Sequence, residues 1–167
     1  MHKYSVPIED PANTVHTNAK SLRIKFKNAR EVSVHLKRLT LTRATAFLKN
    51  VINRKDCIKV TRYAKKCGRT AQAKKYERGS SRADSRGKWP VKPCQAFIGL
   101  ISNLVTEAEK KGIEPDDLVI VHCQVNKAPQ IYGRIQRAYG RVNPYNTKPC
   151  HVEMIAMRKP LVVADAD

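Results

Sequence analysis

Acidic residues are scarce in this chain of 167 residues. It holds 14 Asp and Glu against 33 Lys and Arg, which gives a formal net charge of +19. A free globule with that imbalance repels itself, so we expect a polyanionic partner that neutralises the charge. Nucleic acid meets this requirement, because phosphates attract Lys and Arg whatever the base sequence. An anionic membrane surface is the alternative.

Long apolar segments are also lacking. No apolar run reaches about 18 residues, and no basic amphipathic helix has a bulky apolar face. Residues 1–12 contain no apolar stretch typical of a secretory signal. We therefore expect no membrane partner and a cytosolic protein, or a nuclear one during assembly.

Metal and disulfide signatures are absent as well. The cysteines are odd in number and no pair has C-x-x-C spacing, which argues against a disulfide framework and a zinc ribbon: Cys57, Cys67, Cys94, Cys123 and Cys150. A hairpin turn near Gln136 would set Cys123 almost opposite Cys150. Adjacent strand residues point to opposite faces, however, so His122 and His151 could not join them on one ion. We expect no metal and no cofactor.

Common catalytic motifs are missing too, including G-x-S-x-G, the P-loop and H-E-x-x-H. Asp116-Asp117 is the only acidic pair near the start of an expected strand, where a basic nuclease would need carboxylates for metal ions. We expect no enzyme and no catalytic residues, and we keep a nuclease as the weakest alternative.

Hydrophobic periodicity predicts three helices. Their expected ranges are about 29–39, 41–53 and 93–111. Asn28 and Glu31 resemble a capping box for the first helix, and Gly112 suits the end of the third. Whether the first two form a helical hairpin or a kinked pair stays open. Alternation predicts strands at residues 21–26, 118–127 and 151–157.

The chain divides into parts of different composition. Residues 1–18 form an expected extended arm, residues 19–157 a single globular domain and residues 158–167 a short tail. Within the domain, residues 55–92 are a basic insertion that needs a partner to become ordered. It could be an RNA contact, a nuclear-import signal or a disordered segment. A short helix there would place Arg62, Lys65, Lys66 and Arg69 on one face, and Trp89 is expected to pack against the core helix rather than stack on a base.

A long β-hairpin is predicted from Leu118 to Met157. No acid occurs between Leu118 and Val152, while basic residues and tyrosines alternate through the connecting stretch. Each arm would have about 19 residues, on the order of 60 Å when fully extended. A small domain cannot cover such a ribbon, and an isolated two-stranded ribbon is marginal in water. RNA would supply phosphates and splayed bases for it, whereas the alternative is a flexible loop with solvated charges.

Several runs resemble a known family. They are KNARE at residues 27–31, AQAK at 71–74, VNKAP at 125–129, RAYGRVNPY at 137–145 and PCHVEMI at 149–155. These runs resemble large-subunit ribosomal protein twenty-two of the universal numbering, protein seventeen of the eukaryotic numbering, in its eukaryotic and archaeal form. The resemblance covers residues 19–157. It implies an α+β fold, with three helices packed on a small antiparallel sheet and a long protruding hairpin.

The resemblance also implies a role. A structural constituent of the large ribosomal subunit would bind large-subunit rRNA, touch neighbouring ribosomal proteins and place its hairpin tip at the wall of the polypeptide exit tunnel, near the nascent chain. Cytoplasmic ribosomes with nucleolar passage during assembly would be its location. A free RNA chaperone or regulatory RNA-binding protein is the alternative.

The expected contact residues follow from charge and from this resemblance. On the domain and insertion we expect rRNA contacts from basic residues: Arg23, Lys25, Lys27, Arg30, Arg43, Arg62, Lys65, Lys66, Arg69, Lys74, Lys75, Arg82, Arg86 and Lys88. On the hairpin we expect them from Lys127, Arg134, Arg137, Tyr139, Arg141, Asn143, Tyr145 and Lys148. The expected tunnel-facing tip is Gln130, Ile131, Tyr132, Gly133 and Arg134.

Overall fold

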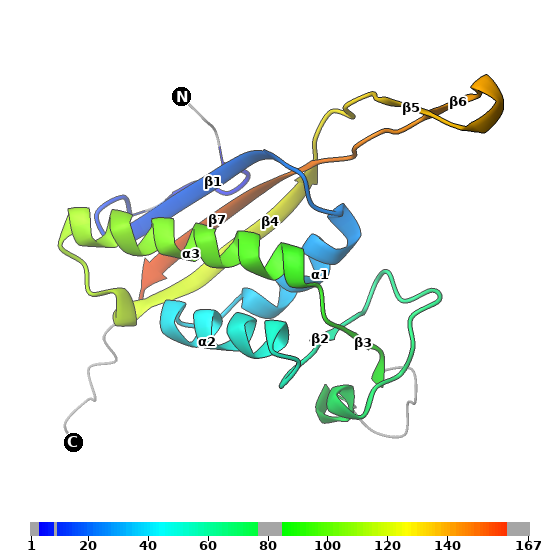
Figure 1. Cartoon of the computed structure of the whole chain (residues 1–167). Coiled ribbons are helices and arrows are strands. Elements are labelled where there is room, and N and C mark those ends of the chain that lie inside the picture. Colours follow the sequence, from blue (N-terminus) through cyan, green and yellow to red (C-terminus); the bar gives the residue numbers. More distant parts are fainter. Residues whose placement is uncertain (1–3, 9, 77–84, 160–167) are drawn as a thin grey trace, which may run out of the picture.

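The computed structural model describes residues 4–8, 10–76 and 85–159. Its fold is α+β, as predicted: an antiparallel sheet of order β1-β7-β4 carries the described α-helices on one face (Figure 1). The sheet strands are β1 (Thr14–Leu22), β4 (Leu118–Lys127) and β7 (Cys150–Arg158). The helices are α1 (Phe26–Leu36), α2 (Leu41–Ile52) and α3 (Val91–Lys111).

The core lies between this sheet and the helices. Phe97, Ile101 and Leu104 of α3 are buried against the apolar side of the sheet, as their i, i+4, i+7 spacing predicts. Val152 and Met154 of β7 are buried in the same core and contribute to it from the sheet. The chain leaves α3 at Gly112, which has a left-handed conformation. The predicted third helix and the two C-terminal strands are confirmed.

The N-terminal strand differs from its prediction. β1 pairs with β7 from Thr14 to Leu22, so the expected arm already contributes to the sheet, and the strand expected at residues 21–26 is wrong. Ser21 has a positive φ of 54°, and the pairing register shifts between Ala19 and Leu22. The chain therefore turns out of the sheet, and the apolar residues that follow lead into α1.

The first helix also begins and ends elsewhere. Lys25 is its N-cap, so the predicted capping box of Asn28 and Glu31 is wrong. The helix stops at Leu36 because the next residues pair with β4: the Arg38 N–H donates to the Ile120 carbonyl at 2.8 Å, and Ile120 N–H donates to the Leu39 carbonyl at 2.9 Å. The predicted second helix is confirmed, beginning after the Thr40 cap.

Two smaller units project from this body on the same side (Figure 1). The insertion contains β2 (Ile58–Lys59) paired with β3 (Gly87–Lys88), and a 3₁₀ helix η1 (Ala71–Tyr76). The hairpin continues beyond β4 and β7 as β5 (Arg134–Gln136) and β6 (Val142–Pro144), joined by the 3₁₀ turn η4 (Ala138–Gly140). A further 3₁₀ turn, η3 (Pro115–Asp117), precedes β4.

Candidate nucleic-acid interface

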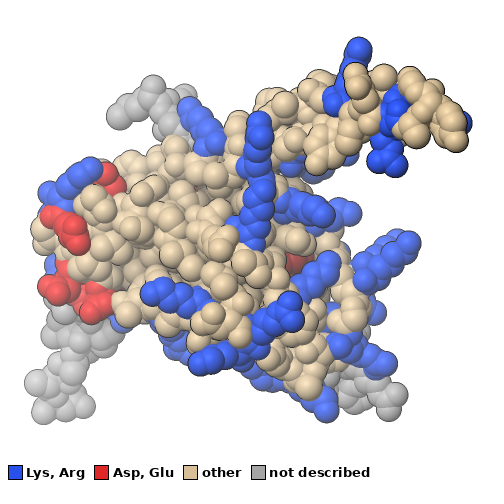
Figure 2. Space-filling view, in the orientation of Figure 1, with Lys and Arg blue, Asp and Glu red and all other residues tan. Residues whose placement is uncertain are grey.

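Charge is distributed unevenly over the surface. Figure 2 shows acidic residues gathered at the end of the molecule that holds the α3 C-terminus and η3, while Lys and Arg cover the insertion and the base of the hairpin. The acidic end consists of Glu107, Glu109, Glu114, Asp116 and Asp117. The opposite end is therefore the one suited to a polyanion.

Within the described ranges, most carboxylates outside the acidic end are engaged in internal contacts. Asp56 accepts from Lys75 Nζ at 2.5 Å and from the Cys57 N–H at 2.6 Å. Glu31 and Glu153 are buried at 3% and 7% exposure and accept several hydrogen bonds each. They therefore project little negative charge toward the basic surface.

The outer part of the hairpin is a ribbon without a core. None of the residues from 128 to 148 is buried. Its arms are held only to each other, through the β5–β6 pairing and a bridge between Ile131 and Thr147. Gly133 permits their close approach, because a Cβ there would lie 2.6 Å from the Tyr145 carbonyl oxygen. This ribbon is the surface that the sequence predicted to need an external partner.

Large apolar side chains on this ribbon face solvent. Tyr139 is 96% exposed, Tyr132 is 81% exposed and Tyr145 is 68% exposed. Rings held clear of the protein are suited to stacking on unpaired bases. Phe97, by contrast, has its ring fully buried in the core.

The apex lies beyond Gln136, the turn position considered for the cysteine geometry. Arg137 donates its N–H to the Arg141 carbonyl at 2.8 Å, which closes the turn around Tyr139 rather than at Gln136. Tyr139 has φ 60° and ψ 35°, a conformation that costs free energy for a residue other than glycine or asparagine. Cys123 consequently pairs with Met154, and Cys150 with Lys127, so the two cysteines are not opposite each other.

The hairpin residues expected to bind RNA are all exposed. Lys127 lies at the end of β4, and the others lie on the outer ribbon: Arg134, Arg137, Tyr139, Arg141, Asn143, Tyr145 and Lys148. The stretch expected to face the tunnel, Gln130–Arg134, lies in the arm that leads to the apex. Ala138–Gly140 forms the apex itself.

The insertion is held by contacts within itself and with α1. Trp89 Nε1–H donates to Gln72 Oε1 at 2.9 Å, and its side chain is 36% exposed. Trp89 thus contacts η1 of the insertion. The expected short helix through Arg62 and Arg69 does not form. Turns occupy residues 62–63 and 65–66, Lys66 has a positive φ of 59°, and Arg69 forms an isolated β-bridge with Arg86.

Most cations predicted on the insertion and domain are accessible. Arg86 and Lys88 are half-buried, Arg82 lies outside the described residues, and the exposed set is Arg23, Lys25, Lys27, Arg43, Arg62, Lys65, Lys66, Arg69, Lys74 and Lys75. Arg30 is half-buried and makes internal contacts: its Nη1 lies 3.0 Å from Thr61 Oγ1 and 3.2 Å from Glu31 Oε1. Lys75 is paired with Asp56, which leaves its charge partly neutralised.

Sequence reasoning missed one cluster at the junction of these elements. Tyr63 packs edge-on against Phe26, with ring centroids 6.1 Å apart. Lys27 Nζ lies 5.5 Å and Arg62 Cζ 5.9 Å from the Tyr63 ring centroid. Lys127 Nζ lies 5.7 Å from the Phe26 centroid. Cations over aromatic faces stabilise such an arrangement. Aromatic residues beside basic ones in the sequence were the available signal.

Glu31 holds the same junction together. Burial raises the pKa of this carboxyl, but hydrogen bonds from Thr61 and Tyr63 and the charge of Arg30 outweigh it, so its pKa is lowered overall. The carboxylate is therefore ionised at neutral pH. It was predicted as a local helix cap and instead joins α1 to a segment thirty residues away.

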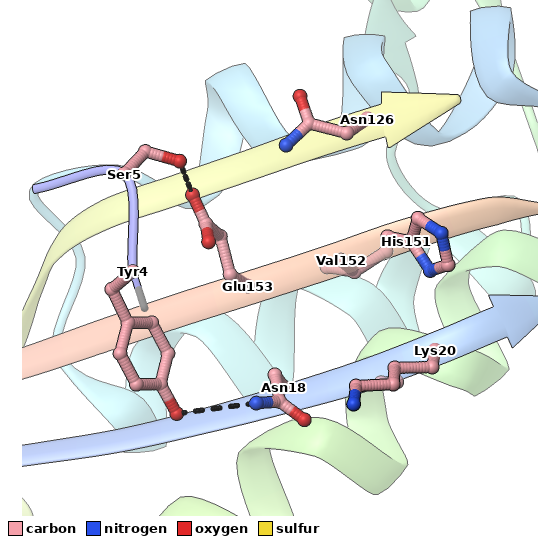
Figure 3. A pocket seen from close by; sticks show the side chains of 9 residues that line it. Tyr4, Ser5, Asn18, Lys20, Asn126, His151, Val152 and Glu153 are labelled. Atoms are coloured by element: carbon pink, nitrogen blue, oxygen red, sulfur yellow. Dashed lines mark hydrogen bonds between the residues drawn. The ribbon is translucent and has the colours of Figure 1, made fainter. Parts of the chain in front are cut away.

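A pocket of about 390 Å³ lies on the sheet face opposite the helices (Figure 3). Since Val152 and Met154 point into the core, His151 and Glu153 point to this face. Ser5 donates to Glu153, and Asn18 Nδ2 donates to the Tyr4 hydroxyl at 3.5 Å. His122 Nε2 also contacts Glu153 Oε1, at 3.2 Å. These bonds outweigh burial and lower the Glu153 pKa. The N-terminal segment is thereby fixed on the sheet.

The residues considered for zinc occupy two faces of the sheet. Cys123 and Cys150 are buried in the core, and burial raises their thiol pKa to about 12 and about 11. His122 and His151 lie partly exposed on the opposite face. Within the described ranges, no group of three His, Cys, Asp or Glu residues has metal-binding geometry.

None of the helices in the described part of the chain combines the length and apolar character needed to cross a bilayer.

Comparisons with known proteins point to one family. Residues 17–157 match the family model for ribosomal protein L22p/L17e. A relative from Podocoryna carnea, named large ribosomal subunit protein uL22, is 40% identical over 167 residues, covering 100% of this chain and 88% of the relative. Proteins of the same name from Maconellicoccus hirsutus (40% identity, 95% and 83% coverage) and Aedes albopictus (39% identity, 99% and 86% coverage) are similar to it. The family is structural rather than enzymatic, and this chain belongs to the ribosomal protein L22p/L17e family.

Proposed function

We propose that the chain is a structural constituent of the large ribosomal subunit and that it binds large-subunit rRNA. The observation that carries this proposal is the outer hairpin: from residue 128 to 148 it has no buried side chain and no acid, yet it keeps a paired conformation. Membership of a ribosomal protein family supports the same partner.

The two projecting units would divide the contacts. Arg134, Arg137 and Arg141 on the hairpin would bind phosphates, and the neighbouring tyrosines would stack on bases. The insertion and the first turn of α1 would supply further phosphate contacts through the exposed cations given above. The acidic end would face away from RNA, toward solvent or neighbouring ribosomal proteins.

Association with the ribosome can be tested directly. We expect the protein to co-sediment with the large subunit through a moderate-salt wash, and to crosslink to a fixed set of large-subunit rRNA sites. Crosslinks scattered over messenger RNAs, with recovery only in the free pool, would instead favour a free RNA chaperone. The protein would then work off the ribosome, rather than on cytoplasmic ribosomes after nucleolar passage during assembly.

The finer proposal is that the hairpin apex and the adjoining arm reach the wall of the polypeptide exit tunnel. Ile131 and Tyr132 are exposed in that arm, so each offers an apolar surface to a passing chain. A photo-crosslinking residue placed at Ile131 or Tyr132 should capture a stalled nascent chain. The same residue at Val34, which is exposed on α1, is the control. Equal capture at all three positions would contradict the tunnel assignment.

A further inference from the structure

The Glu31 carboxylate joins the insertion to the helical body. Its side chain is 5% exposed. Oε2 accepts from the Thr61 N–H at 2.9 Å and from the Thr61 hydroxyl at 3.0 Å, while Oε1 accepts from the Tyr63 N–H at 3.3 Å. An ionised carboxylate only accepts hydrogen bonds, so it suits a place where donors converge. The start of the insertion is thereby fixed to α1.

Three basic elements meet at this contact. Tyr63 is held between Phe26 and the cations of Lys27 and Arg62, and Phe26 in turn carries Lys127 from the base of the hairpin. The chain of contacts therefore runs from the insertion through α1 to the hairpin. Figure 2 shows Lys and Arg on both sides of the hollow between the projecting hairpin and the insertion.

We propose that Glu31 is a positioning residue for RNA binding. By fixing Thr61 and Tyr63, it holds the cations of the insertion in register with those of the α1 N-terminus and the hairpin base, so that one continuous RNA segment contacts all three. The inference rests on the proposed rRNA-binding function. Glu31 would then strengthen RNA binding, although its negative charge alone would weaken it.

Because charge and positioning predict opposite effects on RNA affinity, substitutions can separate them. Glu31→Gln and Glu109→Gln each remove one acid, raising the formal net charge from +19 to +20. Glu109 is exposed at the acidic end and is the matched control. If charge alone mattered, both variants would bind RNA slightly more tightly. With Gln at position 31, the amide NH₂ would face backbone donors, and the insertion would lose its fixed place.

The measurement is filter binding of the full-length protein to a transcript of large-subunit rRNA, with tRNA as competitor, over a salt series. We expect Glu31→Gln to raise Kd about tenfold and to flatten the slope of log K against log salt by about two, as two or three phosphate contacts are lost. Glu109→Gln should leave the slope unchanged. A purely structural role would lower the thermal midpoint without altering the slope.

Failure of the proposed function and failure of the positioning role of Glu31 give different results. If the wild-type protein shows no preference for the rRNA transcript over tRNA, the proposed function fails. If the wild type binds and Glu31→Gln matches Glu109→Gln in both Kd and slope, the positioning role is overturned. Should Glu31→Gln not fold, Thr61→Ala decides instead: it removes one donor to the carboxylate, and we expect a smaller change in the same direction, whereas an unchanged slope would refute the inference.

Discussion

The inner and outer parts of one hairpin differ in what holds them. In β4 and β7, alternate side chains are buried against the helices, and the strands pair from Leu118↔Arg158 to Lys127↔Cys150. Beyond Lys127 the same two arms continue, but none of the residues from 128 to 148 is buried. The inner part is stabilised by burial, and the outer part by its own short ladder. The inner half therefore stabilises the domain, and the proposed RNA contacts lie on the outer half of the same element.

Truncating the core should have the largest effect, and only on the inner half. Phe97 is fully buried against the sheet. We expect Phe97→Ala to lower the free energy of unfolding by about 3–5 kcal/mol, from lost burial and the remaining cavity. Chemical denaturation measures this. The matched change on the ribbon, Val142→Ala at 55% exposure, should stay within about 0.5 kcal/mol. Similar losses of unfolding free energy in the two variants would contradict the difference between the inner and outer parts.

Removing the outer half should have the converse effect. Deletion of residues 130–146, closed by a short turn, takes away Arg134, Arg137 and Arg141 together with the exposed tyrosines. We expect rRNA affinity to fall about a hundredfold, since both phosphate contacts and stacking are lost. The thermal midpoint should barely move, because no buried side chain is removed. A large drop in that midpoint would show that the ribbon stabilises the domain.

Low pH should lower the free energy of unfolding of the domain, because its buried carboxylates become protonated. The pKa values of Glu31 and Glu153 are lowered in the folded protein. Their contribution is complete above the ordinary glutamate pKa and is lost as pH falls through the folded value. We expect Glu153→Gln to cost about 1 kcal/mol at pH 7 and to have little effect near pH 3. An equal cost at both pH values would contradict this linkage.

The smallest effect should come from the apex ring alone. Asparagine tolerates the left-handed conformation of Tyr139, so Tyr139→Asn removes the ring while keeping the turn. We expect rRNA affinity to fall about fivefold, the lower end of base stacking, with stability unchanged within about 0.3 kcal/mol. Tyr139→Gly serves as a second variant. If affinity holds in both, the ring does not stack on RNA.

Periodic burial explains which elements were predictable. α2, α3 and β4 follow local patterns of apolar residues, and their observed ranges lie within two residues of those expected. β1 was misplaced because its boundaries come from pairing with β7, more than a hundred residues later. The alternation after Ser21 looked like a strand but belongs to a segment that turns away from the sheet.

Site residues were predictable to the extent that charge marks them. The acid-free stretch identified the hairpin, and its cations are exposed as expected. Glu31 was misassigned because the capping-box pattern is local, whereas its partners are Thr61 and Tyr63. The exact apex was not predictable, because a left-handed Tyr139 leaves no signal in the sequence.

The separation of acidic and basic ends has a kinetic consequence. At one end, Glu107 to Asp117 offset the charges of Lys110, Lys111 and Arg158, whereas the hairpin and the insertion carry exposed cations at the other end, so the molecule has a dipole along its length. In the field of a polyanion, such a dipole turns the cationic end forward before contact, within roughly 10 Å at 0.1 M salt. The hairpin would thus meet the polyanion first. The association rate, and not only the affinity, would then depend on where the few acids lie.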